Sequence, residues 1–251
     1  MKLSSCLFLS LSFLNSNAFV MRVRKPFASL STDSDRLHAQ IKEKEIQTEP
    51  LLTQRPDPSI LLSAKDDNTQ RLGFYVIFAS VLLGTAGFVQ VLNGLECLLP
   101  TGWFATWRDY TWPIPLGLIY SAAGVAHFTM KDSFAAIVPP LGTWGGLWIV
   151  PAPFSEKLRL SYADYHTYWS GLAEVGCGAM LIGGGLGVLP VQIPAFLLLC
   201  LTTAVTPANI YMATHDVQMP GAPVVPYPSG HLIRGAAQCI LLGILWKLAF
   251  Q

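Results

Sequence analysis

Residues 168–189 read YWSGLAEVGCGAMLIGGGLGVL, an apolar stretch with one acidic residue, Glu174. As an α-helix these residues rise about 33 Å, enough to cross a hydrocarbon layer of about 30 Å. A carboxyl group inside a membrane normally faces the interior of a helix bundle and has a polar or charged partner. Ser170, Gly171 and Gly178 share the face of Glu174 and let a neighbouring helix approach closely. The stretch therefore predicts a membrane helix with a buried polar face.

Four other apolar stretches predict further spans, at residues 72–95, 114–130, 193–214 and 231–250. An aromatic segment with Trp103 and Trp107 separates the first two, and it predicts an interfacial loop. Residues 134–150 are also apolar, but their five prolines and glycines favour a re-entrant or interface-lying segment over a sixth span, which would invert everything downstream. The expected fold class is an all-α polytopic membrane bundle with five spans.

Charge is concentrated before the first span. Of the 31 Asp, Glu, Lys and Arg residues, 18 lie in residues 1–71 and 13 in residues 72–251. The whole chain is 52% hydrophobic and 12% charged, with a mean hydropathy of +0.44. This asymmetry predicts a polar leader and a membrane domain over residues 72–251, in contact with the lipid bilayer. A net charge of +1 and the absence of a basic patch interleaved with aromatics exclude nucleic acid as an expected partner.

The leader has the composition of a targeting sequence. Residues 1–18 predict a signal peptide, residues 19–32 are basic and acid-poor like a transit peptide, and residues 33–71 predict a disordered polar linker. The junction Asn17-Ala18-Phe19 resembles the bipartite plastid presequences of diatoms and their relatives, in which a phenylalanine follows the cleavage site. That resemblance implies a plastid membrane, thylakoid or envelope, of an alga with a secondary plastid. An ordinary secretory signal is the alternative.

Four polar side chains interrupt the spans near their leader-side ends: His127, Glu174, Asn209 and Arg234. If the five spans alternate in direction, all four fall within roughly ten ångströms of one membrane face. We therefore expect a cluster in which a Glu174–Arg234 pair is bridged by His127 and Asn209. Pro207 frees a carbonyl one turn back and opens its helix for a ligand or for neighbouring side chains. The cluster either holds a ligand or exchanges a proton, or it only fixes helix packing.

Loop charges indicate the orientation of the bundle. Five basic residues lie near the membrane on the leader side and two on the opposite side, which places the leader on the cytoplasm-equivalent face. The five are Lys65, Arg71, Lys131, Lys157 and Arg159, and the two are Arg108 and Lys247.

The polar residues belong to motifs with a recognisable order. These are GVAHF at 124–128, IVPP at 137–140, YWSGLAE at 168–174 and PANIYM at 207–212, followed by Arg234. In this order they resemble the DoxX-like membrane proteins, a family named after a subunit of an archaeal thiosulfate:quinone oxidoreductase. The resemblance implies a four-helix membrane core, here with one preceding span. The extra span and the long loop at 217–230 depart from the family pattern.

Two functions from different classes follow as expectations. The first is a redox-linked component that binds a lipid-soluble quinone, with Glu174 exchanging a proton, Arg234 fixing charge, and His127 and Asn209 bonding the ligand oxygens. The second is a non-catalytic assembly or scaffold subunit of a membrane complex. A small-molecule transporter is a third reading, which the position of the cluster near one face disfavours.

Other chemistries have weaker signals. The cysteines are scattered without a CxxC pair, so no thiol relay is expected. Asp164 with His166, and His215 with Asp216, are spaced to bind a surface metal, but solvated loop residues are the commoner explanation, and no metal site is predicted. No phosphate loop, GxSxG or HExxH motif is present. The reaction and the substrate are not encoded in any of these patterns.

Overall fold

The computed structural model describes residues 55–250. Every regular element in this range is a helix, and the range contains no strand. The expected signal peptide, the transit-like segment and most of the expected linker lie outside this range. The all-α class is therefore confirmed for the membrane domain.

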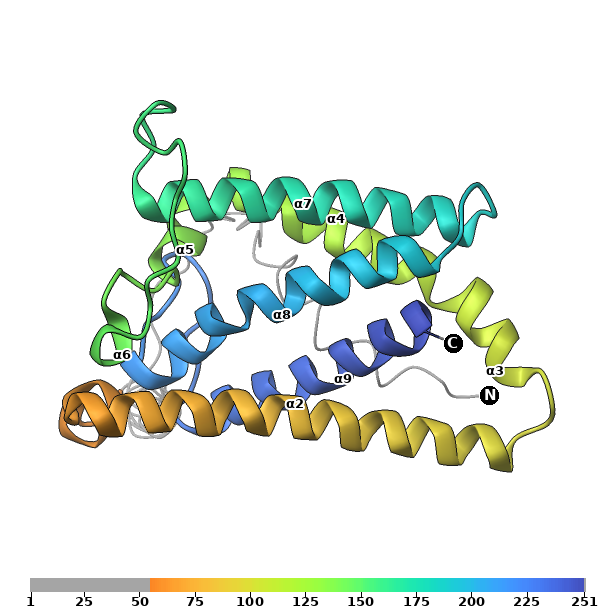
Figure 1. Ribbon diagram of the computed structural model, residues 1–251, viewed down its shortest axis with the longest axis horizontal. Coiled ribbons are helices and arrows are strands. Elements are labelled where there is room, and N and C mark those ends of the chain that lie inside the picture. The colour runs from red at the N-terminus through yellow and green to blue at the C-terminus, as the bar shows by residue number, and fades with distance from the viewer. Residues whose placement is uncertain (1–54, 251) are drawn as a thin grey trace, which may run out of the picture. The chain divides into compact units, whose positions relative to one another are not determined.

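Five long helices occupy the five predicted stretches, and Figure 1 shows that they run in alternating directions along the bundle. They are α2 (Asp67–Leu98), α4 (Pro113–Thr129), α7 (Tyr162–Gly185), α8 (Gln192–His215) and α9 (Ser229–Phe250). Within the described part of the chain, three of them are long and apolar enough to cross a membrane: α2, α8 and α9. The helix α4 has 17 residues, and α7 carries more polar residues in its first turns.

Local capping sets where these helices begin. The Asp66 side chain accepts a hydrogen bond from the amide of Thr69 and starts α2, and the Ser161 hydroxyl accepts from the amide of Asp164 and starts α7. Because of the second cap, α7 begins six residues before the predicted span, at Tyr162. Its first two turns extend the helix beyond the apolar stretch.

The closest helix pair is α4 with α7, and glycines make it possible. A Cβ atom added at Gly117 would lie 2.6 Å from the carbonyl oxygen of Gly178, and one added at Gly124 would lie 2.6 Å from that of Gly171. Any larger residue would force the backbones apart. The apolar core then forms where α8 and α9 join this pair, from Leu116, Tyr120, Leu181, Leu198, Leu245 and Leu248.

Residues 131–150 form no spanning helix. They fold as two short helices, α5 (Lys131–Ala136) and α6 (Thr143–Gly146), separated by Pro139 and Pro140. Trp144, in α6, is fully buried with a left-handed backbone (φ 55°), and its indole N–H donates to Thr214 Oγ1 at 3.1 Å. This non-spanning form agrees with the breakers in the sequence and keeps the direction of the later helices.

The connection between α2 and α4 is also short and helical. It holds α3 (Trp103–Thr106) and a π-helical turn, η3 (Trp107–Thr111), at the end of the bundle opposite α5 and α6. The rings of Trp103 and Trp107 stack at 5.8 Å between centroids. An aromatic segment of this kind suits the headgroup level of a membrane.

Residues 55–66 differ from the expected disordered linker. They form two 3-10 turns, η1 (Pro58–Ile60) and η2 (Leu62–Ala64), before α2 begins. Two contacts hold them: Leu61 is buried, and Arg55 pairs with Asp216 at 2.7 Å. A composition-based reading could not find this, because the partner lies 161 residues away in the sequence.

Large apolar side chains cover the outside of the bundle. The helix α2 in particular exposes a row that includes Leu72, Val76, Leu83, Val91 and Leu95. A water-soluble domain rarely exposes apolar patches of this extent, whereas a lipid environment solvates them.

Candidate functional site

Two of the four predicted polar residues meet between α4 and α7. The Nδ1 atom of His127 lies 3.4 Å from Oε2 of Glu174, and both residues are only 8% exposed. The glycine-lined contact brings them together, since a Cβ atom at Gly171 would lie 2.6 Å from that of His127. The phenyl ring of Phe134 stacks on the imidazole at 3.8 Å and covers it from the side of α5.

The hydrogen bonds of this pair are incomplete. His127 Nδ1 lies 2.9 Å from the carbonyl oxygen of Ala123, one turn back in α4. Because a carbonyl oxygen only accepts, Nδ1 carries the hydrogen in this bond and Nε2 is left as the ring atom for another partner. Glu174 Oε2 is buried and has no hydrogen-bond partner. A buried carboxyl oxygen in this state requires a proton, a ligand or a water to offset its lost hydration.

The other two predicted residues meet between α8 and α9. The guanidinium of Arg234 donates to Oδ1 of Asn209 at 2.7 Å and approaches the sulfur of Met212 at 3.4 Å. Its Nε atom is buried without a partner. Asn209 in turn donates through Nδ2 to Oε1 of Gln238 at 3.3 Å.

The expected Glu174–Arg234 ion pair is absent among the described residues, so the single bridged cluster was predicted incorrectly. Glu174 contacts His127, whereas Arg234 contacts Asn209. The reason lies in the packing order, because α7 packs on α4 and α9 packs on α8. Each pair of helices therefore joins its own polar residues.

The supporting residues lie beside these pairs. The Ser170 hydroxyl is buried and donates to the carbonyl of His166 at 2.8 Å, so it serves its own helix. Gly171 packs directly against His127, since a Cβ atom added at Gly171 would lie 2.6 Å from the Cβ atom of His127. Pro207 is buried inside α8, two residues before Asn209.

Sequence reasoning missed Gln238 and three residues near it. The Gln238 amide donates to the carbonyl of Thr202 at 3.2 Å and to the hydroxyl of Thr206 at 3.0 Å, and Thr202 Oγ1 bonds the Tyr120 hydroxyl. A polar chain thus runs from Arg234 through α8 to α4. Helical spacing could have revealed it, since Gln238 follows Arg234 by four residues.

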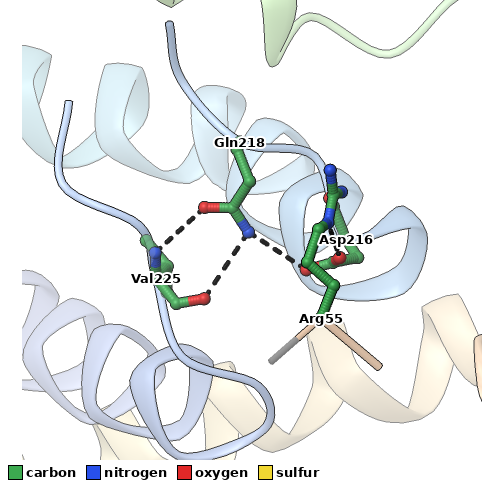
Figure 2. Close-up of polar contacts among 4 residues, drawn as sticks. All are labelled: Arg55, Asp216, Gln218 and Val225. Carbon is green, nitrogen blue, oxygen red and sulfur yellow. Dashed lines mark hydrogen bonds and ion pairs between the residues drawn. The ribbon is translucent and has the colours of Figure 1, made fainter. Parts of the chain in front are cut away.

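A second polar network closes the leader-side end (Figure 2). Arg55 pairs with Asp216, and the Gln218 amide donates to Asp216 Oδ1 at 3.0 Å while its Oε1 accepts from the amide of Val225 at 2.9 Å. The 217–230 loop is therefore anchored to the chain before α2. Asp164 pairs with Lys131 at 3.0 Å, so the acidic partner in each suggested metal pair has a basic residue instead.

At the opposite end, Lys247 is not a surface charge as the orientation argument assumed. It is 1% exposed, and its ammonium donates to Asn93 Oδ1 at 2.7 Å and Glu96 Oε2 at 2.9 Å. These contacts tie α9 to α2.

The bundle with its lipid-facing surface and buried polar pairs defines an all-helical membrane protein. The chain belongs to the family described as a domain of unknown function (DUF8561), whose model matches residues 116–250. That range begins inside α4 and includes both polar pairs. No curated protein and no solved structure matches the chain.

Proposed function

We propose that this protein is a DoxX-like, redox-linked membrane component that binds a lipid-soluble quinone beside His127 and Glu174. One observation carries the proposal: Glu174 Oε2 is buried with no hydrogen-bond partner, 3.4 Å from a histidine whose Nδ1 is already bonded to a carbonyl. The pair therefore has unused hydrogen-bonding capacity inside an apolar bundle. A quinone supplies the missing partners, since its carbonyl oxygens accept and the hydroxyls of its quinol donate.

The chemistry assigned to the pair is proton exchange with a bound ligand. A protonated Glu174 donates to a quinone carbonyl, and the carboxylate accepts from a quinol hydroxyl. We assign the second contact to His127 Nε2, the ring nitrogen that is not bonded to the carbonyl of Ala123. Reduction of a quinone to its quinol takes two electrons and two protons. In the proposed step a membrane redox partner supplies the electrons, Glu174 delivers one proton, and water at the adjacent membrane face supplies the other.

Arg234 and Asn209 receive a different role from the one the sequence suggested. They bond each other and reach Gln238, so we assign them to holding α8 against α9. The resemblance of residues 17–19 to plastid presequences supports a plastid membrane as the location, where lipid-soluble quinones are abundant, and this location is part of the proposal.

The test is mass spectrometry of small molecules that co-purify in mild detergent. We expect near-stoichiometric quinone with the wild type and its loss from Glu174→Gln at an unchanged melting temperature. Asp132→Asn is the matched control, because it makes the same carboxyl-to-amide change on an exposed side chain at the same end. Equal quinone in all three proteins would refute the site.

A second candidate function is a non-catalytic assembly subunit. It is favoured by the polar chain from Arg234 to Tyr120, most of whose bonds are satisfied within the bundle as expected of structural contacts. Migration of the solubilised protein in a native gel distinguishes the two. A complex that survives Glu174→Gln, with no quinone in the wild type, would favour assembly.

A further inference from the structure

The start of α9 carries two side-chain nitrogens that have nothing to bond. Among the described residues, His231 Nε2 and Arg234 Nε are both buried without a hydrogen-bond partner. The two residues are three positions apart, so they share one face of the helix. Gln238, four residues further on, lies on the same face and bonds α8. The two nitrogens therefore lie on the side of α9 that turns toward α8.

The charge of Arg234 has no counter-ion. Its contacts both use Nη2 and go to neutral atoms, Oδ1 of Asn209 at 2.7 Å and the sulfur of Met212 at 3.4 Å. No carboxylate in residues 55–250 forms an ion pair with it. The last acidic residue of the chain, Asp216, pairs with Arg55 instead. A cation inside a membrane bundle normally pairs with an opposite charge, and leaving one unpaired is costly.

The position of Arg234 on its helix adds to this deficit. The helix α9 begins at Ser229, so His231 and Arg234 lie in its first two turns, and the first turn has no acidic residue. The N-terminal end of a helix carries partial positive charge, which disfavours a cation and favours an anion. The helix end and the unpaired guanidinium therefore call for the same kind of partner, one with negative charge.

The loop at 217–230 folds back against the start of α9. The rings of Tyr227 and His231 lie 5.9 Å apart between centroids, and a Cβ atom added at Gly230 would lie 2.7 Å from Cγ1 of Val225. The amide of Val225 is bonded by the Gln218 side chain, as Figure 2 shows. Because the loop is held in this way, the space beside His231 suits a small group attached to the rest of its molecule by a single bond.

Two exposed apolar side chains stand between His231 and Arg234 in the sequence. Leu232 is 70% exposed and Ile233 is 52% exposed. In a membrane such side chains contact lipid, so an acyl chain can lie along them while its polar end reaches the two nitrogens.

We propose that His231 and Arg234 bind a carboxylate, with one oxygen at Arg234 Nε and the other at His231 Nε2. Two N–H donors match the two oxygens of a carboxylate, with the His231 hydrogen on Nε2. Its one negative charge balances the one guanidinium, and its single substituent suits a space bordered by the loop. The carboxylate belongs to a fatty acid lying on Leu232 and Ile233, or to a small soluble acid that enters from the leader side. The site is separate from the proposed quinone site and does not depend on it.

The test is ligand titration of the purified full-length protein in mild detergent, followed by native mass spectrometry. Palmitate should bind about tenfold more tightly than hexadecanol, which has the same chain and no carboxylate. Arg234→Gln should weaken palmitate about tenfold, and His231→Phe about fivefold, because the phenyl ring keeps the contact with Tyr227 and lacks Nε2. Arg159→Gln makes the same arginine-to-glutamine change on an exposed loop residue, so it is the matched control and should change nothing.

Equal binding of palmitate and hexadecanol by the wild type would overturn the proposal. Wild-type affinity for palmitate in His231→Phe would also overturn it, and this variant decides the matter if Arg234→Gln does not fold. Butyrate distinguishes the two sources of the carboxylate. Competition by butyrate at the concentration of palmitate assigns the site to soluble acids, and competition only by long chains assigns it to fatty acids, so both outcomes support the proposal. Tighter binding of phosphatidylglycerol than of palmitate would show a phosphodiester site and refute it.

Discussion

Replacing Gln238 by leucine should destabilise the bundle by about 1–2 kcal/mol, since hydrogen bonds between membrane helices average about 0.6 kcal/mol each. The change removes three bonds, at 3.0 Å to Thr206 Oγ1, 3.2 Å to the carbonyl of Thr202 and 3.3 Å to Asn209 Nδ2. The Thr206 hydroxyl keeps its own bond to Thr202, which limits the loss. In the variant, Asn209 Nδ2 is left without a hydrogen-bond partner, and this unpaired amide adds to the loss of stability.

The assay is reversible unfolding of the wild type and Gln238→Leu in the same detergent, followed by helical circular dichroism against denaturant. Ile240→Leu is the control, because it places a leucine at an exposed position of the same helix and removes no hydrogen bond. A Gln238→Leu protein as stable as the wild type would refute the reasoning. It would show that this polar chain contributes nothing to holding α8 on α9.

Three further predictions concern packing and charge. Trp144→Ala should cost about 3–5 kcal/mol, since it leaves a large cavity where a fully buried side chain packs, and thermal unfolding measures it. Gly124→Leu should prevent stable folding, seen as aggregation in detergent, because its Cβ would lie 2.6 Å from a carbonyl oxygen. The Ser161 hydrogen bond and the Lys131 ion pair lower the pKa of Asp164, which precedes the predicted span. Asp164→Asn should therefore be less stable than the wild type at pH 7 by under about 1 kcal/mol, and the difference should vanish as the pH falls below about 4.

Matched variants separate these causes from general damage. Trp144→Phe loses mainly the bond to Thr214 and should cost much less than Trp144→Ala. Gly94→Leu, on the open side of α2, should fold normally because nothing lies within 4 Å of its added Cβ. Asp132→Asn makes the same carboxyl-to-amide change on a side chain that is 87% exposed, and it should leave the stability nearly unchanged. If Gly94→Leu fails like Gly124→Leu, the close α4–α7 contact is not the explanation.

The five helical stretches and the non-spanning 134–150 segment could be predicted from the sequence, because apolar length and helix breakers act locally. The neighbours of each helix could not. Periodicity identifies a buried face on α7 but does not say whether α4 or α9 covers it. That single unknown led Glu174 to be matched with Arg234, when glycines on both sides of the contact match it with His127. The sequence did contain a signal for the contact between α4 and α7, because Gly117 and Gly124 share one face of α4.

Sequence reasoning also missed what depends on distant partners. Arg55 holds the segment before α2 through Asp216, and Lys247 is buried by Glu96 and Asn93. In each case a charged residue in an unremarkable context is fixed by a side chain over 150 positions away. Composition describes such residues as solvated, and only the packed bundle shows otherwise.

The close backbone contact between α4 and α7 has a consequence for motion. With almost no side chain between them, these helices have little freedom to slide or repack, so we expect their amides near Gly124 and Gly171 to exchange hydrogen most slowly in the bundle. The distance between His127 and Glu174 should therefore stay constant while other parts of the bundle open and close.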